Sequence, residues 1–155
     1  MGFSEKMRES LGAEGARVTV QGPEQAVARG ETTTASITIV GGTRTATVDA
    51  LYVRIVEADR HWVRNEDGAQ VSESDAQALD NRKGLTAGWV RHAVLEKRVE
   101  VGHTIEPSQE HSLTIDVEIP ADCKATAPYC SHTLNVQADI KGQIDPAGNV
   151  RVTLA

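Results

Sequence analysis

The chain is poor in aromatic residues, in cysteine and in long hydrophobic runs. Aromatic residues make up 3% of the 155 positions. A hydrophobic core in a chain of this length must therefore be built mainly from Val, Ile and Leu. The aromatic positions are Phe3, Tyr52, Trp62, Trp89 and Tyr129.

The sequence also lacks the signals of a membrane or secreted protein. No apolar run approaches the roughly 20 residues that a transmembrane helix needs. The first six residues carry charges where a signal peptide would be apolar. We therefore expect a cytoplasmic protein for which membrane contact is a minor reading.

Concentrated positive charge is missing as well. The net charge is −6, from 22 acidic and 16 basic residues that are scattered along the chain. A nucleic-acid partner would favour a clustered basic face, so we expect no nucleic-acid binding.

The two cysteines, Cys123 and Cys130, do not define a disulfide framework. In a reducing compartment, two free thiols are the default expectation, although a bridge closing this short loop is the alternative. Two ligands do not make a metal site, so the pair alone predicts no metal.

Catalytic signatures are absent. The sequence has no nucleophile elbow, phosphate-binding loop, dinucleotide-binding motif or zinc-protease motif. The acidic stretch 65–68 does not fit a calcium-binding loop in register. The histidines share no ligand-like spacing, and we expect no catalytic, metal-binding or cofactor-binding residues and no cofactor. These histidines are His61, His92, His103, His111 and His132.

Helical periodicity occurs only near the amino terminus. Phe3, Met7 and Leu11 recur every four residues between charged positions, which predicts an amphipathic helix over residues 3–11. So short a helix must dock on something to be stable. We expect it to lie on its own domain, with a partner-binding role as the alternative.

From residue 18 onward, apolar and polar residues alternate, as in strands with one buried face. Turn signals separate the strands, and no strand–helix–strand rhythm appears. The pattern predicts an all-β, antiparallel β-sandwich of seven to nine strands. We divide the chain into residues 1–15, a helix and linker, and residues 16–155, a single sandwich domain. The expected strands cover residues 32–40, 46–57, 89–101, 113–119, 133–140 and 150–154, with a shorter one around 18–20. Residues 60–64 are expected either to extend the 46–57 strand or to form its hairpin partner.

Residues 65–88 interrupt this pattern with a long polar segment. We expect a polar loop with a helical turn around Asp75–Leu79, and loops of this length are commonly functional or disordered. Trp62 and Trp89 flank the segment. Each is predicted to plug the end of the core or to contact a partner.

Several turn and core motifs resemble a known family. They are Leu11–Val18, Arg29-Gly30-Glu31 before a strand, Ile105–Glu110 before the strand that ends at Pro120, and the closing stretch Asp139–Gly142. Together they resemble the amino-terminal domain of the sporulation-control family of bacterial arrestin-like proteins, whose members usually carry two such domains. The resemblance implies an arrestin-like (immunoglobulin-like) sandwich and a regulatory or scaffolding role, and it supplies no catalytic residues.

The leading functional hypothesis is therefore a non-catalytic protein-interaction module. The partner-contact candidates are Phe3, Met7, Leu11, Trp62 and Trp89. An open edge strand would also allow homo-oligomers. The alternative is a small-ligand or metal-dependent enzyme that uses histidines gathered at one end of the sandwich. A membrane-peripheral regulator held by the residue 3–11 helix is the third reading.

Overall fold

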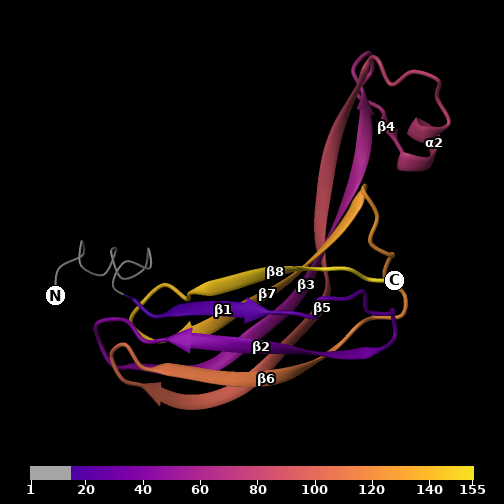
Figure 1. The fold of residues 1–155 in the computed structure, drawn as a ribbon. Coiled ribbons are helices and arrows are strands. Elements are labelled where there is room, and N and C mark those ends of the chain that lie inside the picture. Colours follow the sequence, from indigo (N-terminus) through magenta and orange to yellow (C-terminus); the bar gives the residue numbers. More distant parts are fainter. Residues whose placement is uncertain (1–14) are drawn as a thin grey trace.

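Two antiparallel sheets pack face to face in the computed structural model, which describes residues 15–155 (Figure 1). The smaller sheet has the order β1-β2-β6, formed by Arg17–Gln21, Thr32–Val40 and Glu110–Glu118. The larger sheet is built on β3, Ala46–Arg64, which pairs with β5, Leu85–Ile105, on one side and with β7, Cys130–Ile140, on the other. β8, Ala147–Val152, completes it beside β7. The predicted antiparallel sandwich is confirmed.

The core between the sheets is aliphatic, as the scarcity of aromatics requires. Alternate residues of each strand point inward, because successive side chains of a strand lie on opposite faces. Ile37 and Ile39 of β2 and Leu51, Val53 and Ile55 of β3 are fully buried. The outward residues between them are polar or partly exposed, which explains the strict alternation in the sequence.

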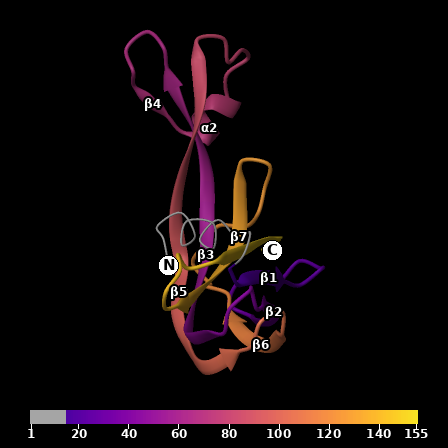
Figure 2. The same ribbon diagram turned by 90° about the vertical axis from the view of Figure 1, so that its left-hand side faces the viewer.

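The strands β3 and β5 continue beyond the sandwich as a two-stranded arm, defined here as residues 60–89. β7 stops pairing with β3 at Asp59 and Cys130, whereas β5 pairs with β3 as far as Arg64 and Leu85. Figures 1 and 2 show the arm projecting away from the two sheets. The molecule therefore has a sandwich body and a projecting arm.

The predicted polar loop, residues 65–88, forms the tip of this arm and contains regular structure. The two residues of β4, Gln70–Val71, pair with β3, and α2, Glu73–Gln77, follows directly. Ser72 caps α2 by accepting a hydrogen bond from the Asp75 amide at 3.1 Å. The helical turn lies two residues before its expected position. β5 begins at Leu85, before the expected start at residue 89, because cross-strand pairing with β3 compensates for a weak hydrophobic pattern.

The helix expected over residues 3–11 lies outside the described residues. Among residues 15–155, no helix is long and apolar enough to cross a membrane. The outer edge of β5 pairs with no further strand of the described chain. Self-association through such an edge stays a prediction.

Candidate functional site

Three polar side chains lie in a row across the inner face of the large sheet, where the arm begins. Glu57 of β3 is directly opposite His92 of β5 and His132 of β7 in the strand registers. Paired residues in antiparallel strands share one face of the sheet. The Glu57 carboxylate lies 3.8 Å from His92 Nε2 and 3.7 Å from His132 Nε2. Pairing of three strands thus brings together residues that are far apart in the sequence.

A second row lies two residues further toward the arm. Asp59 of β3 is opposite Cys130 of β7, and the Cys130 thiol lies 3.6 Å from Glu57 Oε1 and 4.0 Å from His132 Nε2. We call Glu57, Asp59, His92, Cys130 and His132 the arm-base cluster. It borders a pocket of about 340 Å³.

The cluster is more buried than polar groups normally are. Glu57 and His132 are the buried polar or charged residues of the described chain, with exposed fractions of 2% and 0%, and Cys130 is 1% exposed. His92 is half-exposed, and Asp59 pairs with Lys124 at 3.3 Å. Burying an ionised carboxylate is costly unless a positive partner compensates, so Glu57 needs an explanation.

The surroundings disfavour charge on the other two buried members. Burial lowers the pKa of His132 below its usual range, although Glu57 and Asp59 oppose this change. Burial raises the pKa of Cys130 to about 12, with help from the Asp59 and Glu57 carboxylates. The imidazole is therefore neutral and the thiol protonated at neutral pH when no cation is bound.

His132 is held in orientation from its far side. Its Nδ1 lies 2.7 Å from the Thr126 hydroxyl, and the same hydroxyl accepts a hydrogen bond from the Leu154 amide at 2.9 Å. Nε2 consequently points at Glu57 and Cys130. The loop before β7 thus fixes the ring that the β7 strand supplies.

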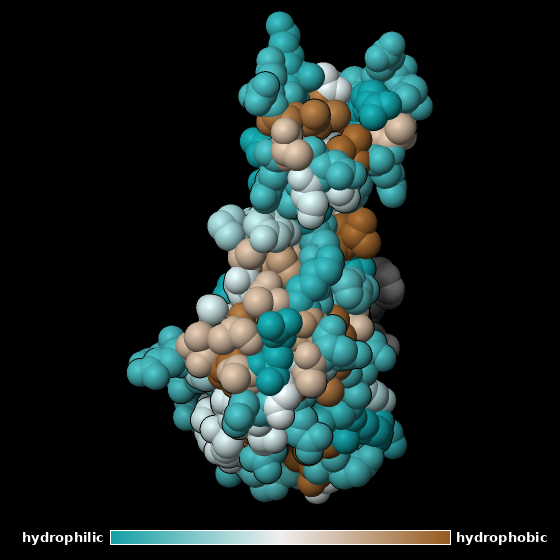
Figure 3. All heavy atoms as spheres, turned by 90° about the vertical axis from the view of Figure 1, so that its right-hand side faces the viewer, coloured by the Kyte–Doolittle hydropathy of each residue, from teal (hydrophilic) through white to brown (hydrophobic). Residues whose placement is uncertain are grey.

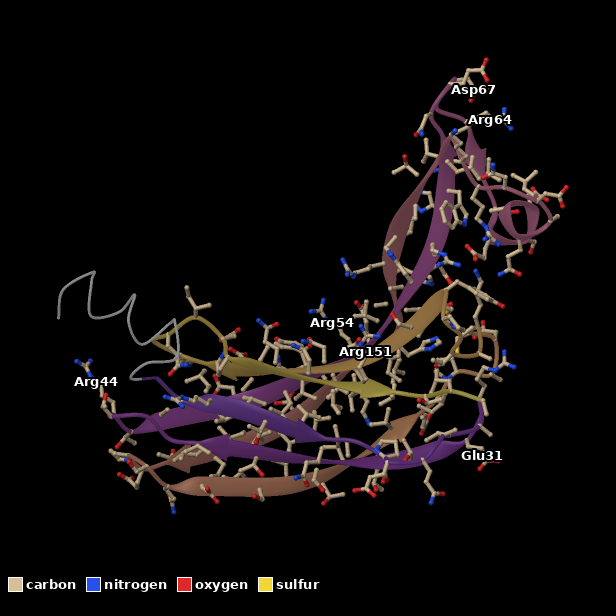
Figure 4. The ribbon with its side chains drawn as sticks, turned by 45° about the horizontal axis from the view of Figure 1, so that its top comes forward. Glu31, Arg44, Arg54, Arg64, Asp67 and Arg151 are labelled. Atoms are coloured by element: carbon tan, nitrogen blue, oxygen red, sulfur yellow. The ribbon has the colours of Figure 1, made fainter. Side chains whose placement is uncertain are left out.

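The outer face at the arm base carries a different surface. A groove of about 510 Å³ runs beside Trp89 and Arg91 of β5 and Arg151 of β8. Trp89 is 45% exposed. Figure 4 places Arg54 and Arg151 on this side of the large sheet, near the start of the arm. The groove is lined by Ala58, Trp89, Arg91, Thr126, Ala127, Pro128, Ser131 and Arg151.

The groove is basic although the chain as a whole is acidic. No acidic residue lines it. Arg91 and Arg151 form no ion pair with the described residues, whereas Arg60, further along the arm, pairs with Glu73. Two unpaired guanidinium groups beside an exposed indole are typical of a binding surface, because Trp and Arg are enriched among residues that dominate binding energy.

At the arm tip, Trp62 takes part in an internal tether. Its indole N–H donates a hydrogen bond to Glu73 Oε2 at 2.7 Å, and the Arg60 guanidinium lies 5.1 Å from the centre of the ring. The hydrogen bond from Arg60 is the main reason that the pKa of Glu73 falls to about 2. These contacts fasten α2 to β3. Figure 3 shows a small hydrophobic group near this end of the arm, surrounded by hydrophilic residues.

The predicted partner-contact residues are therefore placed differently. Phe3, Met7 and Leu11 lie outside the described residues. Trp62 contacts its own arm, and Trp89 lines the open groove. Their roles in partner binding stay predictions. Cys123 and Cys130 are both free and buried.

Sequence reasoning missed the arm-base cluster because its members follow no spacing motif. One feature of the sequence did indicate a polar site in this strand. The inward positions Leu51, Val53 and Ile55 continue to Glu57 and Asp59 with the same two-residue period. An acidic residue at an inward position of a strand is a sign of a polar site inside the sheet interface.

The fold defines the class of protein as an arrestin-like β-sandwich. A structural comparison matches the crystal structure of Spo0M, the sporulation control protein from Bacillus subtilis, with a TM-score of 0.68 and 17% sequence identity. The family model for Spo0M, described as SpoOM protein, matches residues 4–153. The chain belongs to the Spo0M family.

The match covers 90% of this chain and 49% of the Bacillus subtilis chain. This chain thus spans about half the length of that relative. At this identity the structural likeness shows the fold alone. A comparison with curated protein sequences finds no match.

Proposed function

We propose that this chain is a non-catalytic protein-interaction module of the cytoplasm that binds an acidic segment of a partner protein in the groove at the arm base. By analogy with the sporulation control protein from Bacillus subtilis, the binding serves a regulatory process such as sporulation. The observation that carries the proposal is the pair of unpaired arginines, Arg91 and Arg151, beside the exposed Trp89.

Charge complementarity identifies the partner. Opposite charges across an interface accelerate encounter and select against partners of the wrong sign. The groove offers two positive charges and one aromatic face, so a segment rich in Asp or Glu that carries an apolar residue fits it. A nucleic acid would need a longer basic track than two arginines supply.

The root of the arm forms one side of the groove. Trp89 and Arg91 come from β5 at the root of the arm, whereas Ser131 and Arg151 come from the body. A partner bound there contacts both parts of the molecule. Five of the eight lining residues, including Trp89 and both arginines, lie on strands, so these groups need little ordering when the site binds.

The test is a titration with a synthetic acidic peptide, monitored by backbone amide chemical shifts of the whole chain. Shifts should concentrate on residues 89–91, 129–131 and 151, and the affinity should fall as salt is raised. The double variant R91E/R151E should abolish binding. The matched control Lys141→Glu reverses one charge at the far turn of β7 and should bind normally. In a spore-forming host, R91E/R151E should lower spore yield and K141E should not.

Uniform weak shifts over the surface, or equal binding by R91E/R151E and K141E, would remove the groove as the site. If the titration supports the groove, cross-linking from position 131 in cells identifies the natural partner. A cross-linked protein supports the proposal only if the R91E/R151E variant fails to capture it and the K141E control still captures it.

A further inference from the structure

The arm-base cluster has the composition, spacing and charge of a metal site. Cys130, His132 and Glu57 form one group whose ligand atoms lie within 4.8 Å of one another, and Glu57, Asp59 and His92 form a second. The groups share Glu57. We propose that the chain binds one zinc ion at the arm base through Cys130 Sγ, His132 Nε2 and the Glu57 carboxylate, with His92 Nε2 as the fourth ligand.

The spacing of the ligand atoms supports this assignment. The three contacts among Glu57, Cys130 and His132 measure 3.6, 3.7 and 4.0 Å. The carboxylate–imidazole separations are too long for ordinary hydrogen bonds. Zinc bonds of about 2.0–2.3 Å in a tetrahedron place neighbouring ligand atoms roughly 3.3–3.8 Å apart. Glu57, Cys130 and His132 therefore need only small movements to close on a cation, whereas the half-exposed His92 ring, which is grouped with Glu57 and Asp59 only, must turn inward to join them.

The charges also balance. Binding of Zn²⁺ displaces the thiol proton of Cys130 to solvent. The thiolate and the Glu57 carboxylate then supply two negative charges against two positive ones, and both imidazoles stay neutral. Asp59 keeps its pairing with Lys124. A neutral assembly removes the cost of burying Glu57 without a positive partner.

The tautomer of His132 is set by a partner behind the ring. Metal-bound histidines generally donate their second N–H to an oxygen acceptor, which fixes the ring. Thr126 Oγ1 lies 2.7 Å from Nδ1 and is positioned by the Leu154 amide. With the proton on Nδ1, the lone pair of Nε2 faces the cluster. The mixed sulfur, nitrogen and oxygen set is one that zinc accepts.

Four protein ligands make this a closed, structural site. They come from three adjacent strands, β5, β3 and β7, at the level where β7 ends and the arm begins. The ion would fasten the root of the arm to the body. The ion would lie on the inner face of the sheet and the groove lies on the outer face, although Thr126 borders both.

The test uses the full chain purified without a histidine tag. Zinc added to chelator-treated protein should bind at one ion per chain and raise the melting temperature. Cobalt should give a thiolate-to-metal charge-transfer band and the strong visible bands of tetrahedral coordination. Cys130→Ser should remove the charge-transfer band, and Cys123→Ser, a matched buried cysteine outside the cluster, should leave it unchanged.

Because buried variants can fail to fold, the half-exposed ligand gives a second measurement. His92→Gln should fold normally and weaken zinc binding about tenfold or more. His103→Gln, on the same strand but outside the cluster, should bind like the parent chain. No stoichiometric binding by the parent chain, a cobalt spectrum without sulfur ligation, or equal affinities of the two histidine variants would each overturn the site.

Discussion

The body and the arm share two strands, β3 and β5, but are stabilised differently. In the body, β3 lies between two partner strands and buries Leu51, Val53 and Ile55 completely. In the arm, residues 60–89, Ala76 alone is buried. A two-stranded ribbon without a core is marginal by itself. The arm therefore depends on its continuity with the body and on the Glu73 tether, whereas the body depends on apolar burial.

The largest expected difference between the regions comes from truncating the body core. Leu51→Ala should lower the free energy of unfolding by about 2–5 kcal/mol, because it removes fully buried methyl groups and leaves a cavity. Val90→Ala, at a residue that is 51% exposed beside the arm, should change it by less than about 0.5 kcal/mol. Urea unfolding of both variants measures the contrast. Equal losses of unfolding free energy in the two variants would mean that side chains at the arm root are packed as tightly as those of the body core.

Glycine substitutions give a second, smaller contrast. A Cβ at Gly148 would lie 2.7 Å from the Val18 carbonyl oxygen, which is backbone and cannot move easily. Gly148→Ala should cost about 1–3 kcal/mol by overpacking. At Gly88 the obstacle is the His61 ring, 2.7 Å away, which can rotate. Gly88→Ala should therefore cost less in the same thermal melts, and a reversed order would contradict this account.

The tether should affect the arm without affecting the body. Glu73→Gln removes the charged acceptor of Arg60 and Trp62. Amide hydrogen exchange should speed up in residues 72–79, and the indole fluorescence of Trp62 should shift toward that of a solvated ring. The unfolding midpoint of the body should hardly move. Asp67→Asn, near the arm turn, is the matched control and should leave α2 protected.

The smallest effect is on pH dependence. The pKa of Glu73 is about 2 in the folded chain, below its ordinary value of 4.5. A lowered pKa means that the tether contributes fully above pH 4.5 and is lost as the pH falls toward 2. The protection of the α2 amides, measured as the ratio of the intrinsic to the observed exchange rate at each pH, should fall over that interval in the parent chain. The E73Q variant should show no such fall, since it has lost the titrating group.

The alternation of apolar and polar residues predicted the sandwich because each strand of the body has one buried face. Along the arm it indicated the extension of β3 over residues 60–64. It missed the start of β5, because neither face is buried there and β5 begins four residues before the hydrophobic pattern does. The arm-base cluster was beyond sequence reasoning for another reason. Glu57, His92 and His132 become neighbours only through the registers of two strand pairs, and register depends on the whole sheet.

The sequence did not predict the groove, although it pointed to one of the residues that line it. The sequence singled out Trp89 as an aromatic residue at a strand end, and the structure leaves it exposed beside Arg91. Trp62 was singled out for the same reason, but its indole N–H donates a hydrogen bond to Glu73 of its own arm. The difference lies in α2, whose acidic first turn supplies an acceptor to one tryptophan and not to the other.

The passage of β3 and β5 from the body into the arm, with one register irregularity between Ile55 and Val56, has a mechanical consequence. Both strands cross the arm root without a hinge residue in a left-handed conformation; the nearest glycines with positive φ are Gly68 and Gly84 at the tip and Gly102 inside the body. A force on α2 is therefore transmitted along the two hydrogen-bonded strands of the arm. It reaches the large sheet at the level of Glu57, between the inner cluster and the outer groove.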